Sequence, residues 1–126
     1  MKHDEAGPQI NYGDIFWVAA DEFIGSISGS PHPHVLVQAD VFNHSRITTV
    51  VVCSLSSNLK RASEPGVLLL DAGEGGLERQ SVVIASQVSS IPKSRLGAFI
   101  GSLSTQRTDQ VVAALCYLQA SHFRGR

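Results

Sequence analysis

The strongest constraint on the fold is a run of nine residues rich in β-branched side chains, ITTVVVCSL at residues 47–55. Because β-branched residues lose rotamer freedom in a helix and pack well on a pleated surface, this run predicts a central strand. The run stops at a short polar segment, SSN at residues 56–58. Shorter apolar runs predict further strands at residues 15–20, 34–41, 67–70 and 81–88, the last ending before Pro92.

Helical patterning is confined to the C-terminal part of the sequence. Residues 105–122 repeat apolar side chains at 3.6-residue spacing, with Ser104 or Thr105 as candidate N-cap and Gly125 as the closing residue. A shorter helical turn is predicted within residues 93–103, whose apolar side chains would share one face: Leu96, Phe99, Ile100 and Leu103.

Glycine, serine and proline interrupt the predicted strands in two places. Residues 21–33 contain two glycines, three serines and two prolines, and predict a loop, because proline lacks the N–H that a sheet interior requires. Residues 71–76 carry three glycines and predict a turn with positive φ angles. Several short strands, one late helix and no strand–helix alternation predict a mainly β (α+β) fold, a small antiparallel barrel of five to seven strands with a C-terminal α-helix.

Size and composition limit the class of protein. The 126 residues predict a single domain, 1–126, with a loose N-terminal lead-in at 1–11. A hydrophobic fraction of 43% excludes general disorder, and a net charge of −1 excludes a strongly cationic mode of nucleic-acid binding, although a local basic patch remains open. The polar start and short apolar runs predict a cytoplasmic protein without membrane association. Cys53 and Cys116 stand in apolar surroundings and are expected to be reduced and buried.

Two histidines form the first candidate constellation. His32 and His34 have a spacing that occurs in metal sites, but no third ligand has a matching position, so neither a metal ion nor another cofactor is expected. The two residues could be a loop histidine and a strand-edge histidine with no shared role. Alternatively, His32 could act as a general acid or base near neutral pH.

Hydroxyl and basic side chains follow the central strand. Ser56 and Ser57 end it, and no GxSxG motif precedes them, so a serine-hydrolase site is not supported. Strand-end serines usually do no more than end a strand. Lys60 and Arg61 would ordinarily be solvated surface charges, and they gain interest where they flank the same cleft.

Several segments, taken in order, resemble the MazF/PemK family of toxin endoribonucleases. The resemblance covers roughly residues 12–118. The matching segments are GDIFW at 13–17, GS at 25–26, HPHVLVQ at 32–38, FN at 42–43, LSSN at 55–58, LERQSVV at 77–83 and QVSSI at 87–91.

The resemblance implies a homodimer of Src-homology-three-like barrels that cleaves single-stranded RNA without a metal ion. The RNA 2′-hydroxyl would attack the adjacent phosphate and leave a cyclic phosphate and a 5′-hydroxyl. A cognate antitoxin protein is implied as partner, its C-terminal segment lying in the RNA-binding groove. No contact of the toxin itself with DNA is expected.

The resemblance also implies the site residues. Relatives place an arginine and a threonine where this chain has His32 and Ser56, which are therefore the expected catalytic residues. Serine keeps the hydroxyl, whereas histidine loses the permanent charge and forked geometry of arginine and gains proton transfer near neutral pH. The implied RNA-binding residues are Ser28, Ser30, Gln38, Ser57, Lys60, Arg61, Ser86 and Gln87.

The missing arginine leaves a second interpretation open. The chain would then be a module of the same fold that binds RNA or a protein target without cleaving it. Ser86 is a further departure, since relatives often carry an acidic residue before the glutamine, here Gln87. The two interpretations differ in whether any cleavage occurs.

Overall fold

A computed structural model describes residues 9–19 and 30–124, with side chains described as far as residue 119. The strands are β1 (Asp14–Val18), β2 (His32–Leu36), β3 (Thr49–Ser56), β4 (Val67–Leu70), β5 (Ser81–Pro92) and β6 (Leu96–Ser102). The helices are α1 (Asp40–Asn43) and α2 (Thr105–Arg124), and short 3₁₀ turns are η3 (Leu59–Ser63), η4 (Glu74–Gly76) and η5 (Lys93–Arg95).

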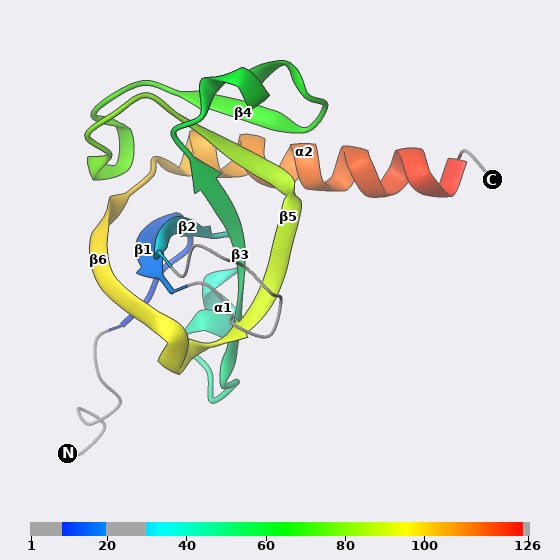
Figure 1. The fold of residues 1–126 in the computed structure, drawn as a ribbon. Helices are drawn as coiled ribbons and strands as arrows, with labels where there is room; N and C mark the ends of the chain where they lie inside the picture. Colours follow the sequence, from blue (N-terminus) through cyan, green and yellow to red (C-terminus); the bar gives the residue numbers. More distant parts are fainter. Residues whose placement is uncertain (1–8, 20–29, 125–126) are drawn as a thin grey trace.

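The six strands form one antiparallel sheet in the order β4-β5-β3-β2-β1-β6. The sheet curls on itself, with β6 and β5 on opposite sides of the ring and α2 running across one end (Figure 1). Within the described residues β4 and β6 remain edge strands and do not pair with each other. The mainly β prediction, with a late helix, is confirmed, and the expected barrel is a strongly curved sheet that hydrogen bonds do not close.

Alternating side chains of β1 bury into two separate clusters, as period-2 geometry requires. Ile15 lies in the larger cluster, which α2 covers through Val111, while Phe16 lies in the smaller one. Both faces of this strand are therefore covered, with Trp17 as an exposed exception. Ile10, from the described end of the predicted lead-in, packs against the smaller cluster.

Glycines allow η4, in the connection between β4 and β5, to pack directly against the edge strand β6. The predicted turn has positive φ angles of 97° at Gly73, 62° at Gly75 and 80° at Gly76, which confirms that prediction. η4 lies against β6 so closely that a Cβ on Gly76 would stand 2.6 Å from the carbonyl oxygen of Ile100. A Cβ on Gly101 would overlap the carbonyl oxygen of Gly75. Backbone-to-backbone packing of this kind admits no side chain.

Arg107 of α2 connects η4 to β4 by hydrogen bonds. Its guanidinium donates from Nε and Nη2 to the Glu74 carboxylate at 2.9 and 3.0 Å, and from Nη2 to the carbonyl oxygen of Leu69 at 2.7 Å. The hydrogen bond from Arg107 is the main reason that the pKa of Glu74 lies below its ordinary value. The last bond occupies a backbone acceptor of an edge strand, which would otherwise be left to solvent.

We expect Arg107→Ala to lower the free energy of unfolding by about 1 kcal/mol near neutral pH, because it removes a forked, partly exposed ion pair. Since the folded-state pKa of Glu74 is depressed, this stabilisation is present above the unfolded pKa and is lost as the pH falls through the folded value. Urea unfolding of both proteins at neutral and acidic pH checks this. A difference that stays constant down to acidic pH would contradict it.

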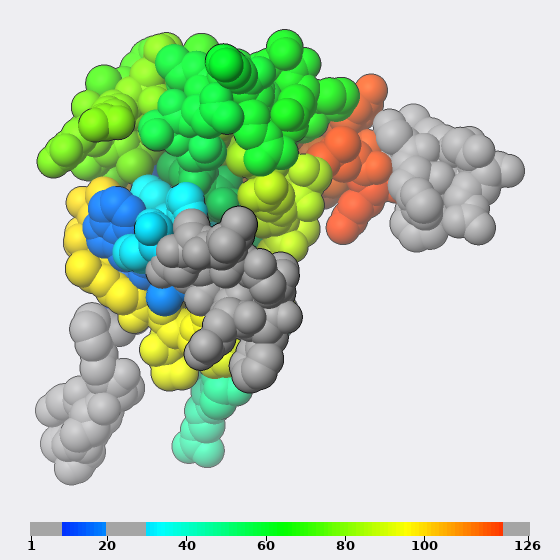
Figure 2. All heavy atoms as spheres, viewed as in Figure 1, coloured from blue at the N-terminus to red at the C-terminus, as the bar shows by residue number. Residues whose placement is uncertain are grey.

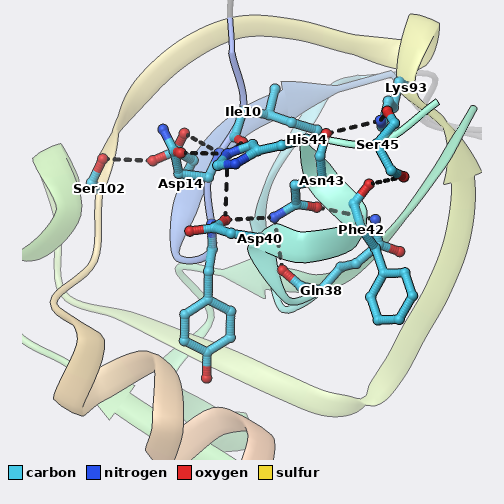
Figure 3. A network of polar contacts seen from close by, with 12 residues as sticks. Ile10, Asp14, Gln38, Asp40, Phe42, Asn43, His44, Ser45, Lys93 and Ser102 are labelled. Carbon is cyan, nitrogen blue, oxygen red and sulfur yellow. Dashed lines mark hydrogen bonds and ion pairs between the residues drawn. The ribbon is translucent and has the colours of Figure 1, made fainter. Parts of the chain in front are cut away.

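The strand predicted at residues 34–41 is wrong at both ends. β2 begins at His32, since a proline is tolerated where a strand starts, and Pro33 pairs there with Trp17 of β1 alone. At the other end, side-chain hydrogen bonds fold the chain into α1 (Figure 3). The buried amide of Asn43 donates to the carbonyl of Gln38 at 2.8 Å and to the Asp40 carboxylate at 3.0 Å. These side-chain hydrogen bonds favour the helical turn of α1 over continued strand pairing.

The helical turn predicted within residues 93–103 is wrong for most of its length. Apart from η5, this segment is strand β6, paired with β1. Its glycines explain the difference, because a Cβ on Gly97 would stand 2.8 Å from the carbonyl oxygen of Trp17.

The strand predicted at residues 81–88 is longer in the structure. β5 does not end before Pro92 but continues through it, with an irregularity in its pairing with β3 between Cys53 and Ser54.

The C-terminal helix α2 is confirmed from its first turn. The Ser104 hydroxyl accepts a hydrogen bond from the backbone N–H of Arg107 at 3.1 Å, as an N-cap does, and Gly125 lies outside the described residues.

The two cysteines differ in exposure. Cys53 is buried as expected, and burial raises the pKa of its thiol to about 11. Cys116 is exposed, contrary to expectation, because it lies on the solvent side of α2.

Candidate functional site

A cavity of about 510 Å³ opens where the ends of several strands meet. Its described walls come from the end of β1, the start of β2, the end of β3, the connection between β4 and β5, and β6. In Figure 2 the surfaces of β1 and β2, in blue and cyan, lie between β6 in yellow and the green segments that follow β3. The polar residues in its lining are His32, Ser56, Ser57, Glu78, Arg79 and Ser81.

Strand register brings His32 and Ser56 to this cavity. In the antiparallel pair of β2 and β3, His34 stands opposite Ser54. The same register continued by two residues sets His32 opposite Ser56, and residues two apart on a strand share a face. Both residues line the cavity, so two side chains that are 24 positions apart in sequence meet there.

The hydroxyl of Ser56 has a defined role in its local structure. Its oxygen accepts a hydrogen bond from the backbone N–H of Asn58 at 3.0 Å. A serine hydroxyl also carries one proton to donate, and no described residue accepts it. The exposed hydroxyl of Ser57 follows directly and lines the same cavity. This end of β3 therefore presents hydroxyl donors suited to an anion.

The two histidines of β2 have different environments. The ring of His34 is partly buried and its Nδ1 lies 2.9 Å from the carbonyl oxygen of His32. Burial is the main reason that the pKa of His34 is lowered, so its ring is neutral at neutral pH. The side chain of His32 is exposed and lines the cavity. Of the two, His32 is the one placed for exchange of a proton with a ligand.

The other expected binding residues lie in different places. Ser28 lies outside the described residues, and Ser30 precedes Pro31, which lines the cavity. The amide of Gln38 donates to the Asn43 side chain at 3.0 Å within the network of Figure 3. The Arg61 guanidinium pairs with the Glu64 carboxylate at 3.1 Å. Three further residues are exposed outside the cavity lining: Lys60 on η3, and Ser86 and Gln87 on β5.

Two aromatic and two charged residues are among the lining residues that the sequence did not single out. Trp17 and Phe99 are 42% and 58% exposed, which is unusual for large aromatic rings and leaves them accessible at the cavity. Glu78 and Arg79 bring opposite charges to the same lining. The signal for Glu78 and Arg79 was their place in LERQSVV, one of the segments that resemble the family.

The described residues give two further results. Within 9–19 and 30–124, no three histidine, cysteine, aspartate or glutamate side chains gather so as to hold a metal ion. Among the helices of that same part of the chain, none combines the length and the apolar character needed to cross a bilayer.

Comparisons with known proteins agree on one family. Endoribonuclease EndoA of Bacillus subtilis (strain 168) is 29% identical over 106 residues, which is 84% of this chain and 90% of that protein. The solved structure of MazE-MazF (Form-II) from Deinococcus radiodurans has a similar fold, with a TM-score of 0.72 at 19% identity over 90% of this chain and 97% of that one.

A second solved structure is an endoribonuclease in complex with its cognate antitoxin from Mycobacterial species. Its TM-score is 0.70 at 16% identity, over 88% of this chain and 95% of that one. The model of the family described as PemK-like, MazF-like toxin of type II toxin–antitoxin system matches residues 11–118. This chain therefore belongs to the PemK/MazF family of toxins of type II toxin–antitoxin systems.

Proposed function

We propose that this protein is the toxin of a toxin–antitoxin pair and a sequence-selective endoribonuclease that cleaves single-stranded RNA. The observation that carries this proposal is that His32 and Ser56, from two different strands, line one cavity. The sequence relative EndoA is named an endoribonuclease, which supports the same activity here. A cavity lined by proton-transferring and hydroxyl side chains suits a reaction at a phosphate.

In the proposed reaction the RNA 2′-hydroxyl attacks the adjacent phosphorus. The P–O5′ bond breaks, leaving a 2′,3′-cyclic phosphate and a 5′-hydroxyl. Glu78, the one carboxylate among the described lining residues, accepts the proton of the 2′-hydroxyl. The imidazolium of His32 donates a proton to the departing O5′, and the hydroxyl of Ser56 donates a hydrogen bond to a non-bridging phosphate oxygen. No metal ion is required by these steps.

The aromatic rings of the cavity support single-stranded RNA as the substrate. Every base has a π-face, and unstacked bases stack on exposed aromatic side chains. Trp17 and Phe99 offer such rings beside the proposed scissile phosphate. DNA lacks the attacking 2′-hydroxyl, so it would not be cleaved even where it is bound.

The proposal extends to partners and location. The solved relative in complex with its cognate antitoxin supports an antitoxin protein as partner. The homodimer that the resemblance implies is part of the same proposal. We place the protein in the cytoplasm, where RNA is available to it.

We expect Ser56→Ala to lower the rate of RNA cleavage by about 10-fold, since it removes one hydrogen bond to a charged group. Ser56→Thr should retain most of the rate because it keeps the hydroxyl. The measurement is cleavage of single-stranded RNA by the purified protein in EDTA, with Ser90→Ala as control, because Ser90 is an exposed serine of β5 outside the cavity lining. Wild-type protein that binds RNA without cleaving it would overturn the proposal and favour a non-cleaving binding module.

A further inference from the structure

The charges of the cavity point to a residue that compensates for the absent family arginine. Among the described lining residues the ionisable side chains are His32, Glu78 and Arg79. A histidine is cationic only when protonated, whereas a guanidinium is cationic at every accessible pH. Arg79 is therefore the one described residue of the lining with a permanent positive charge.

The chain around Arg79 is fixed, while its guanidinium has no partner among the described residues. Leu77, two residues before it, is buried in the larger core cluster, and Ser81, two residues after it, donates from Oγ to the Arg79 carbonyl at 3.0 Å. The Arg79 side chain is exposed, and no described carboxylate pairs with it. Arg61 and Arg107, by contrast, are each paired with a glutamate. The donors of Arg79 thus remain available to an anion.

We propose that Arg79 binds the scissile phosphate and supplies the permanent charge that His32 cannot supply. This inference rests on the proposed ribonuclease function. Attack by the 2′-hydroxyl places additional negative charge on the non-bridging phosphate oxygens, and a guanidinium can donate two parallel hydrogen bonds to them. Proton transfer is then the task of His32, and charge stabilisation is the task of Arg79.

The test compares Arg79→Ala and Arg79→Lys with Arg46→Ala, which removes an exposed arginine outside the cavity lining. Two quantities are measured, namely the rate of RNA cleavage and the affinity for the same RNA carrying 2′-O-methyl groups, which cannot be cleaved. We expect Arg79→Ala to lower the cleavage rate by about 100-fold, as loss of a donor to a developing oxyanion does. Arg79→Lys should recover part of that rate, and Arg46→Ala should leave it unchanged.

The affinity measurement separates this inference from the proposed function. Loss of one phosphate contact should weaken binding of the methylated RNA and reduce the salt dependence of binding by about one charge. Cleavage and binding by Arg79→Ala that both stay within about twofold of wild type would overturn the inference while leaving the ribonuclease function standing. Absence of cleavage by the wild type would overturn the function, and the salt dependence would then decide whether Arg79 binds phosphate.

Discussion

Replacing His32 with alanine is expected to lower the rate of RNA cleavage by about 100- to 10,000-fold, which is the range that a general acid contributes. The alkoxide that leaves when the P–O5′ bond breaks is strongly basic, so a proton must reach O5′ as the bond breaks. His32 is exposed at the start of β2, and its side chain makes no hydrogen bond with a described residue. Its removal should therefore leave folding unchanged, which thermal unfolding of the variant checks.

A modified substrate distinguishes proton donation from a purely structural role of His32. When sulfur replaces the O5′ atom at the cleaved bond, the leaving thiolate needs no proton. The His32→Ala variant should cleave this RNA at nearly the wild-type rate, and so should His32→Gln, which keeps a polar side chain of similar size. An equal deficit on the oxygen and sulfur substrates would contradict the assignment of His32 as general acid.

Gly101→Ala is expected to have the largest effect on stability, a loss of about 3 kcal/mol in the free energy of unfolding. The new methyl group would overlap the carbonyl oxygen of Gly75 and stand 3.1 Å from the backbone nitrogen of Gly76. Backbone atoms cannot rotate away as a side chain can, so η4 and β6 must separate. A loss of this size is a substantial fraction of the stability of an ordinary domain.

Urea unfolding measures this effect through the denaturant midpoint at unchanged slope. The control is Ala98→Ser on the same strand, where the exposed side chain adds one atom toward solvent and should change stability by less than about 0.5 kcal/mol. Because η4 borders the cavity through Gly76, we also expect Gly101→Ala to reduce cleavage under folding conditions. A Gly101→Ala protein as stable as wild type would show that η4 and β6 do not pack in this way.

The fold could be predicted wherever local preference and tertiary contacts agree. The β-branched run that became β3 and the amphipathic segment that became α2 are of this kind. Prediction failed where contacts distant in sequence decided the outcome. Helical spacing within β6 is overridden by glycines that lie against the backbones of Trp17 and Gly75, and the end of β2 is set by the buried amide of Asn43.

The residues of the candidate site could likewise be predicted only in part. The resemblance to the family predicted His32 and Ser56 as residues of one site, and the structure shows that both line the cavity. Trp17 and Arg79 could not be predicted, because each is a single exposed residue without a periodic pattern, and only the curvature of the sheet brings them to one cavity. In the proposed site Arg79 supplies a permanent charge, and the absence of such a charge at His32 was what left a non-cleaving module open.

The proposed ribonuclease function requires that the RNA is cleaved in the cavity by attack of its own 2′-hydroxyl. The most direct test is to analyse the ends of the fragments that the wild-type protein releases from single-stranded RNA in EDTA. We expect 2′,3′-cyclic phosphate and 5′-hydroxyl ends, and no cleavage where a single 2′-deoxynucleotide replaces the nucleotide whose 2′-hydroxyl would attack. Fragments with 5′-phosphate ends, or continued cleavage at the 2′-deoxy position, would contradict it.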